Sequence, residues 1–212
     1  MHIYLMSNSK DKDITPAEAL NSILGGALKT FNLKREDIVK ISSVLKPLNL
    51  DKGEIFCRKG HVCDKIGILM NGLLYAYYES EKGNEEVSRF FFINGNFIVS
   101  SFDSFINKKP ANETIKAIEK SEILCISYKS LHNLYETIPQ MNFIGRQLAE
   151  QSYVRAMQRV HDLQALDAKG RVEKFLGEHP DFYNRIKKKH LASYLGMNYN
   201  LVREYFKPAN GK

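Results

Sequence analysis

The residues of this sequence best suited to binding chemistry lie near its C-terminal end. Three consecutive lysines, Lys187, Lys188 and Lys189, could neutralise the phosphates of a nucleic acid backbone. The polar segment after them carries side chains that can bond to base edges or phosphates, namely Asn198, Tyr199, Asn200, Arg203 and Lys207. An Asn side chain can pair with an adenine edge, and Glu204 could accept a hydrogen bond from cytosine.

Two short helices joined by a tight turn are predicted to hold these side chains. The first helix has one apolar face, formed by Leu191, Ala192 and Leu195. Gly196 follows this face at once, where a helix end favours a residue with positive φ. Asn198 occupies an N-cap position before a second apolar run, which Pro208 ends. The pattern over residues 186–206 predicts a helix-turn-helix, whose second helix would lie in the major groove of DNA.

The charge distribution agrees with that prediction. The 212 residues have a formal net charge of +7, and most of the excess lies beside the predicted helix-turn-helix. Residues 182–212 hold seven Lys and Arg residues and one Glu, a net charge of +6. A basic excess on such a unit is the electrostatic pattern of phosphate contact. The alternative is a solvated basic tail without a binding role.

Composition and motifs narrow the class of protein. The chain is 43% hydrophobic and 26% charged, and none of its apolar runs reaches the roughly 18 residues that span a bilayer. Its N-terminal apolar stretch is too short for a signal peptide, so we expect a cytoplasmic protein without membrane association. The sequence lacks the metalloprotease, nucleophile-elbow, P-loop and dinucleotide-binding motifs, and its six histidines lack metal-ligand spacing. We therefore expect no enzyme.

The cysteines are expected to be buried thiols. Cys57, Cys63 and Cys125 are odd in number and do not form a disulfide framework. Cys57 and Cys63 lie near His61, but a metal or iron–sulfur site would need tighter clustering or a fourth ligand. The sequence therefore predicts no metal cofactor.

Short β-prone runs dominate the middle of the sequence. Between residues 47 and 128 these runs last about five to ten residues and are separated by Gly or Asn turns. This spacing predicts an antiparallel sandwich, barrel or jelly roll. Helices are predicted before this region, over 15–24 and 34–45, and one short helix is predicted within it, over 102–107.

A long helix follows the β-rich region. A short helix over 130–135 precedes it, and Thr137 is expected to cap a helix that runs to about Ala165, about 40 Å in length. Its apolar stripe includes Met141, Ile144, Leu148 and Met157. We expect this stripe to form the seam of a dimer, and the alternative is a helix packed only within its own chain. A further helix is predicted over 167–179.

The order of these elements resembles the Crp/Fnr family of bacterial transcription regulators. Four segments carry the resemblance: KGEIFCRKGHVCDKIGILMNGLLYAYY (52–78), FFFINGNFIVSSFDSF (90–105), IKAIEKSEILCIS (115–127) and HLASYLGM (190–197). The resemblance implies a cyclic-nucleotide-binding-type β-roll, a dimerisation helix and a winged helix-turn-helix. It also implies a homodimer bound to a palindromic site on double-stranded DNA.

The β-roll departs from the pattern of family members that bind cyclic AMP. Those members have a Gly-Glu pair for the ribose and an Arg-Ser pair for the cyclic phosphate, which Val99-Ser100 and Ala111-Asn112 match here. Because a buried phosphate without an Arg or Lys partner loses its charge-assisted bonds, we expect weak or no cyclic AMP binding. The residues expected to contact another, unidentified small effector are Val99, Ser100, Ser101, Asn112, Glu113 and Thr114, although the polar ones are as easily turn residues.

The helix-turn-helix departs from the family as well. Where the family commonly presents Arg, Glu and Arg to base edges, the matching residues are Tyr199, Asn200 and Glu204. The sequence ends at Lys212, so we expect a reduced or missing wing. If the protein reads bases, its preference should differ from that of the better-known members of the family.

We therefore predict an α+β fold with an antiparallel β-roll or jelly-roll sensor domain, a long dimerisation helix and a small C-terminal helical DNA-binding domain. The expected units are an N-terminal segment with a short helix (1–30), the β-roll (31–136), the dimerisation helix (137–166) and the helix-turn-helix domain (167–212). The expected function is a homodimeric DNA-binding transcription regulator that senses a small effector. The alternative is an effector-binding or protein-interaction module whose helix-turn-helix has decayed.

Overall fold

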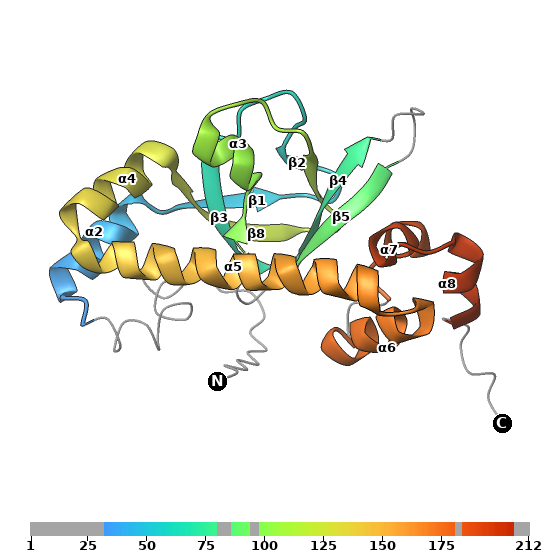
Figure 1. Ribbon diagram of the computed structural model, residues 1–212. Helices are drawn as coiled ribbons and strands as arrows, with labels where there is room; N and C mark the ends of the chain where they lie inside the picture. Colours follow the sequence, from blue (N-terminus) through green and yellow to red (C-terminus); the bar gives the residue numbers. More distant parts are fainter. Residues whose placement is uncertain (1–31, 80–85, 94–97, 181–183, 206–212) are drawn as a thin grey trace.

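Antiparallel sheets, one long helix and a group of C-terminal helices make up the α+β fold, which confirms the predicted fold class (Figure 1). The computed structural model describes residues 32–79, 86–93, 98–180 and 184–205. The predicted helix over 15–24 and the predicted reduced wing lie outside these residues.

Two four-stranded sheets form the β-roll in the described part of the chain. Their strand orders are β1-β8-β3-β6 and β2-β7-β4-β5, and the paired strands are antiparallel. The strands are β1 (Lys46–Leu50), β2 (Ile55–Cys57), β3 (Lys65–Asn71), β4 (Leu73–Glu79), β5 (Glu86–Ile93), β6 (Ile98–Val99), β7 (Thr114–Ala117) and β8 (Ser121–Ser127). The sequence pattern misses β1 because Pro47 interrupts it, and Pro is tolerated there because β1 is an edge strand.

The helices follow the predicted order. They are α2 (Arg35–Val44), α3 (Phe102–Asn107), α4 (Tyr128–Thr137), α5 (Pro139–Ala165), α6 (Ala168–Glu178), α7 (Lys188–Leu195) and α8 (Tyr199–Tyr205). One expected cap is wrong: Thr137 ends α4, where its hydroxyl donates to the carbonyl of Asn133 at 2.6 Å, and Ile138 occupies the N-cap of α5. The short helix expected over 130–135 is longer because its cap is Ser127, whose hydroxyl accepts from the N–H of Ser130.

Strand β4 has both faces buried, which shows how the C-terminal helices sit on the roll. Leu74 and Ala76 point into the core between the two sheets. Tyr75 and Tyr77 point the other way, into a second core that they share with residues of α6, α7 and α8. Because successive side chains of a strand alternate between faces, a strand whose consecutive residues 73–77 are all buried needs a cover on each side. The C-terminal helices supply that cover on the outer face of the roll.

Helix α5 runs along the roll and joins its far end to the C-terminal helices (Figure 1). Met141 and Ile144 are 7% and 4% exposed and pack with residues of α2, α4 and β8. The chain's own core therefore covers two of the residues expected in the dimer seam. Leu148 packs partly against the same core, whereas Met157 is 47% exposed.

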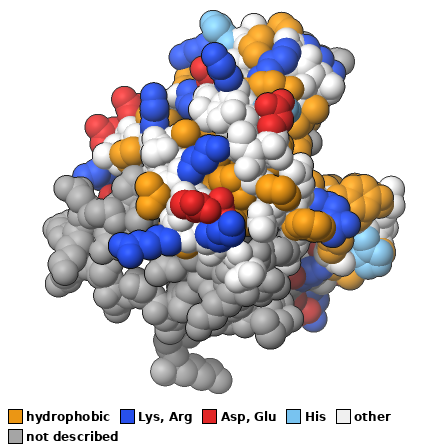
Figure 2. All heavy atoms as spheres, turned by 90° about the vertical axis from the view of Figure 1, so that its left-hand side faces the viewer, with side chains coloured by type: hydrophobic (Ala, Val, Ile, Leu, Met, Phe, Trp, Pro, Cys, Tyr) orange, Lys and Arg blue, Asp and Glu red, His pale blue; other side chains and the backbone are white. Residues whose placement is uncertain are grey.

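The end of the molecule that carries α2 and α4 has a mixed surface. Lys and Arg side chains are interspersed there with hydrophobic and acidic ones, and the coloured residues do not gather into one basic patch (Figure 2). Among the residues that the structure describes, each helix lacks the combination of length and apolar character that a membrane span requires.

Candidate nucleic-acid interface and ligand site

The helix-turn-helix consists of α7, a turn at Gly196 and α8, as the sequence predicts. Gly196 has a φ of +62°, and the N–H groups of Gly196 and Met197 donate to the carbonyls of Ser193 and Ala192 at 3.2 and 3.0 Å. A Cβ at Gly196 would be strained by this φ and would meet a methyl group of Leu163 at 3.0 Å. The turn therefore needs glycine, both for its conformation and for its contact with α5.

Asn198 acts as the predicted cap of α8. Its Oδ1 accepts a hydrogen bond from the N–H of Asn200 at 2.8 Å. The side chain of Asn198 is therefore engaged in holding the helix start, which is a different role from the base contact expected of it. The backbone carbonyl of Asn198 also accepts from the N–H of Val202 at 3.2 Å, which closes the first turn of α8.

Most side chains of α8 are exposed, the apolar Leu201 among them, and Val202 is the buried one of its residues that the structure describes. Tyr199, Asn200 and Arg203 are exposed, and Val202 is fully buried. Of the predicted phosphate-binding lysines, Lys187 and Lys189 are exposed, Lys188 is half-buried, and Lys207 lies outside the described residues. The structure thus brings exposed amide, phenol, guanidinium and ammonium groups together around one turn.

The apolar face of α7 packs on the outer face of the sheet that contains β4 and β5, and α8 packs on α7. Val202 is buried in this cluster. The rings of Tyr75 and His190 lie 4.7 Å apart, and those of Phe91 and Tyr194 lie 4.9 Å apart. Aromatic pairs of this kind add about 0.5–1.5 kcal/mol to the burial itself. The helix-turn-helix is therefore held against the roll by its apolar side, opposite its exposed polar groups.

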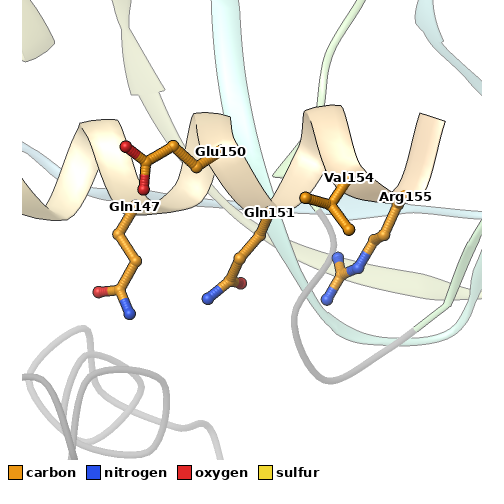
Figure 3. A pocket seen from close by; sticks show the side chains of 5 residues that line it. All are labelled: Gln147, Glu150, Gln151, Val154 and Arg155. Carbon is orange, nitrogen blue, oxygen red and sulfur yellow. The ribbon is translucent and has the colours of Figure 1, made fainter. Parts of the chain in front are cut away.

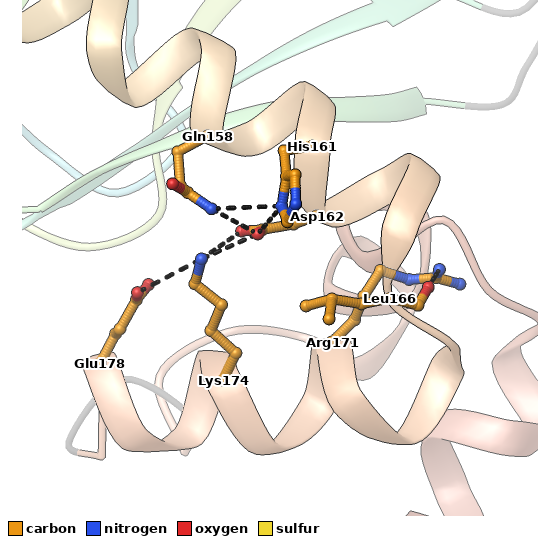
Figure 4. A network of polar contacts seen from close by, with 7 residues as sticks. All are labelled: Gln158, His161, Asp162, Leu166, Arg171, Lys174 and Glu178. Carbon is orange, nitrogen blue, oxygen red and sulfur yellow. Dashed lines mark hydrogen bonds and ion pairs between the residues drawn. The ribbon is translucent and has the colours of Figure 1, made fainter.

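Two ion pairs across the fold reinforce this packing. Arg185, just before α7, pairs with Glu119, which precedes β8. Asp162 of α5 accepts from Lys174 of α6 at 2.8 Å and from Gln158 at 2.9 Å (Figure 4). Burial opposes the ionisation of Asp162, but these hydrogen bonds outweigh it and hold its pKa below the usual value. Sequence reasoning misses both pairs because no local pattern joins partners so far apart along the chain.

The expected effector residues surround α3 and the start of β7. Asn112 is exposed, and the others are buried, namely Val99, Ser100, Ser101, Glu113 and Thr114. The hydroxyl of Ser100 donates to the carbonyl of Lys65 at 3.4 Å, and that of Thr114 accepts from the N–H of Lys59 at 3.2 Å. These two hydroxyls therefore join the segment before α3 to the first residue of β3, and β7 to the segment between β2 and β3.

The position expected for a phosphate-binding arginine is occupied by the methyl side chain of Ala111. The N–H of Ala111 donates to the carbonyl of His61 at 2.9 Å, and its carbonyl accepts from the N–H of Gly60 at 2.8 Å. Lys108, the nearest candidate cation in sequence, has its ammonium 3.2 Å from the centre of the Tyr128 ring. Both the backbone donor and the nearby cation are thus engaged within the chain.

The cysteines are free and buried, as predicted. A hydrogen bond between the Cys57 and Cys63 thiols raises the pKa of Cys57 and lowers that of Cys63. Burial raises the pKa of Cys125 to about 12. Within the described ranges, no group of three or more His, Cys, Asp or Glu side chains could hold a metal ion.

A shallow cavity of about 290 Å³ lies on α5, away from the residues expected to bind an effector. Its lining is formed by Gln147, Glu150, Gln151, Val154 and Arg155. The side chains of Gln147, Gln151 and Arg155 extend from the same side of the helix (Figure 3). Because a single helix lines it, this cavity does not match the enclosed sites that bind small molecules.

Comparison with known proteins agrees with this architecture. Residues 47–138, less than half of the chain, match the family model of the cyclic nucleotide-binding domain. FixK2 from Bradyrhizobium japonicum superposes with a TM-score of 0.64 at 15% identity, over 76% of this chain and 82% of that one. CLP from Xanthomonas campestris is described as a c-di-GMP responsive global regulator. It superposes with a TM-score of 0.63 at 17% identity, over 81% of this chain and 89% of that one.

A third solved structure has a lower score. The catabolite activator protein of Thermus thermophilus gives a TM-score of 0.51 at 16% identity, over 81% of each chain. At 15–17% sequence identity, the similarity to these structures shows that the fold is shared. A search of curated proteins finds no match to the sequence.

Proposed function

We propose that the chain is a homodimeric DNA-binding transcription regulator whose β-roll senses a small effector other than cyclic AMP. The chain has the fold of Crp/Fnr-type regulators, and residues 47–138 match a cyclic nucleotide-binding domain. The sensor roll would correspond to residues 31–136 and the DNA-binding domain to residues 167–212, with α5 between them.

The observation that carries this proposal is the two-sided character of α8. Val202 is buried on one side of α8, in the core that α7 shares with the roll, and the other side presents Asn200 and Arg203 to solvent. Lys187 and Lys189 are exposed at the start of the neighbouring helix. An exposed polar helix flanked by lysines is suited to base contact in the major groove together with contact to backbone phosphates.

The exposed side of α5 supports a dimer. Tyr153, Val160 and Leu163 are 67%, 43% and 41% exposed, an unusual state for large apolar side chains on one helix. With Ala149 and Ala156, which are also exposed, they recur at alternating spacings of four and three residues. This is the a/d pattern of a two-stranded coiled coil, so a second copy of α5 is the natural cover. We place the seam on these five residues, with Met157 at its flank.

Selection from a pool of promoter fragments tests the proposal. The purified protein should enrich a palindromic site whose half-sites are centred about 10 base pairs, or a multiple of this, apart. Binding should weaken with salt, with a slope of log K against log salt of about −0.9 for each phosphate neutralised. Binding that shows neither sequence preference nor salt dependence would contradict the proposal.

We expect cyclic AMP to bind with a Kd weaker than about 1 mM, because Ala111 offers no charged partner to the phosphate and its N–H is already engaged. Isothermal titration calorimetry on the intact protein measures this directly. Micromolar binding of cyclic AMP would show that another cation takes the phosphate. The same titration with cyclic di-GMP tests the ligand class to which the Xanthomonas regulator is described as responsive.

A second candidate function rests on Glu204. Its carboxylate is exposed on α8 and would repel phosphates that approach that side. The alternative is an effector-binding or protein-interaction module whose helix-turn-helix has decayed. A protein partner retained at high salt, together with no retardation of any DNA fragment, would select this alternative.

A further inference from the structure

Each of the last four carbonyl groups of α7 accepts a hydrogen bond. The last four carbonyls of a helix lack partners within the helix. Those of Ala192 and Ser193 accept from the N–H groups of the turn. Those of Tyr194 and Leu195, and that of Gly196 in the turn itself, accept from arginine side chains. Three successive carbonyls just before α8 are therefore held by guanidinium groups.

The first guanidinium comes from the long helix. Arg159 of α5 donates to the carbonyl of Tyr194, and its guanidinium lies 3.8 Å from the centre of the Tyr194 ring. Tyr194 in turn packs edge-on against Phe175 of α6, with ring centres 5.9 Å apart. Burial lowers the pKa of Arg159, but an arginine stays charged at neutral pH. The end of α7 is thereby attached directly to α5.

The second guanidinium comes from α6 and reaches two helix ends at once. Arg171 donates from Nε to the carbonyl of Leu195 at 2.7 Å and from Nη2 to that of Gly196 at 3.3 Å. Its Nη1 donates to the carbonyl of Leu166, the C-cap of α5, at 2.5 Å. Figure 4 shows Arg171 beside Leu166 where the two helices meet. The planar fork of Arg can hold carbonyls in these fixed directions, which the single ammonium of Lys cannot.

We propose that Arg159 and Arg171 are positioning residues that fix α8 relative to α5 and thereby set the half-site spacing that the protein accepts. This inference rests on the proposed function, in which two copies of α5 form the dimer seam. Whatever fixes α8 to α5 in each protomer then also fixes the distance and angle between the two α8 helices. A cation at the C-terminal end of α7 is also favoured by the helix dipole.

Binding to DNA of altered spacing tests the proposal. One base pair inserted between the half-sites of the selected DNA moves them apart by about 3.4 Å and rotates them by about 35°. We expect the insertion to weaken wild-type binding at least about tenfold. In the double variant Arg159→Lys, Arg171→Lys, affinity for the original site should fall and the penalty for the insertion should shrink. A penalty that stays at its wild-type size would overturn the proposal.

Lys174→Ala is the matched control. Lys174 lies one turn after Arg171 on α6 and also binds α5, through Asp162, but its bonds go to Asp162 and Glu178 and not to the turn carbonyls. In this variant the inserted base pair should weaken DNA binding as much as it does in the wild type, even if the variant unfolds at a lower temperature. A merely structural role of the arginines would make the double variant behave like the control, and that result also contradicts the proposal.

Hydrogen exchange without DNA separates this inference from the proposed function. The N–H groups of Gly196 and Met197 are hydrogen-bonded in the turn that the arginines hold. A hydrogen bond to a charged group is worth about a tenfold to hundredfold change in an equilibrium constant. We therefore expect both amides to exchange at least about tenfold faster in Arg171→Lys, with wild-type rates in Lys174→Ala. Unchanged exchange rates in Arg171→Lys would refute the positioning role of Arg171, whether or not the protein binds DNA.

Discussion

Val160→Glu is expected to convert the protein from a dimer into a monomer and to abolish its binding to a two-half-site DNA. Val160 is 43% exposed within the apolar repeat on α5, and in a symmetric dimer each copy would meet its own counterpart there. Burying an unpaired carboxylate costs about 3–5 kcal/mol. The dissociation constant of the dimer should therefore rise at least about 100-fold. Sedimentation velocity over a range of concentrations measures this change.

The same charge on another side of the helix provides the control. Gln151 is exposed on α5 but lies outside the proposed seam, so Gln151→Glu should leave the dimer intact. The loss of DNA affinity in Val160→Glu should exceed the effect on a single half-site, because joining two binding units raises the overall affinity by about 10²- to 10⁴-fold. A Val160→Glu protein that still sediments as a dimer would show that another surface joins the copies.

The periodicity of α5 predicts its existence and length, but it does not identify what covers each face. Met141 and Ile144 have the same apolar character and spacing as a dimer seam, yet residues of α2, α4 and β8 surround them. Tyr153 and Val160 have no such cover in the described chain and are exposed. Spacing along a helix gives the angle of a side chain around the axis. Which neighbour occupies that angle depends on the packing of elements distant in sequence.

The turn and the helix cap of the helix-turn-helix can be predicted from sequence because each depends only on residues close together in the chain. Gly196 and Asn198 act within a few residues of themselves, through a positive φ and a side-chain cap, so the sequence is enough to place them. Arg159 and Arg171 bind carbonyls 35 and 24 residues away, and neither has a local pattern that marks it. Side chains that could contact DNA can therefore be proposed from sequence, whereas the groups that hold their helix in place cannot.

Asn200→Ala should weaken binding to the selected DNA at least about 30-fold while leaving binding to unrelated DNA unchanged. Asn200 is exposed near the start of α8, where an amide can make a bidentate contact to adenine. Such a contact is worth about 1–3 kcal/mol, and a dimer makes it in both half-sites. Its loss should also relax the base preference at one position of each half-site. Repeating the selection with the variant measures both effects.

Lys189→Ala provides the contrast that separates base contact from phosphate contact. Lys189 is exposed in the first turn of α7, so its removal should weaken binding to every DNA alike. It should also make the dependence of log K on log salt shallower by about one unit for each phosphate that the variant leaves without a cation. Asn200→Ala should leave that slope unchanged, since an amide releases no counterion. If Asn200→Ala instead lowers binding to all sequences equally, Asn200 does not read a base, and the exposed Tyr199 and Arg203 become the side chains to substitute next.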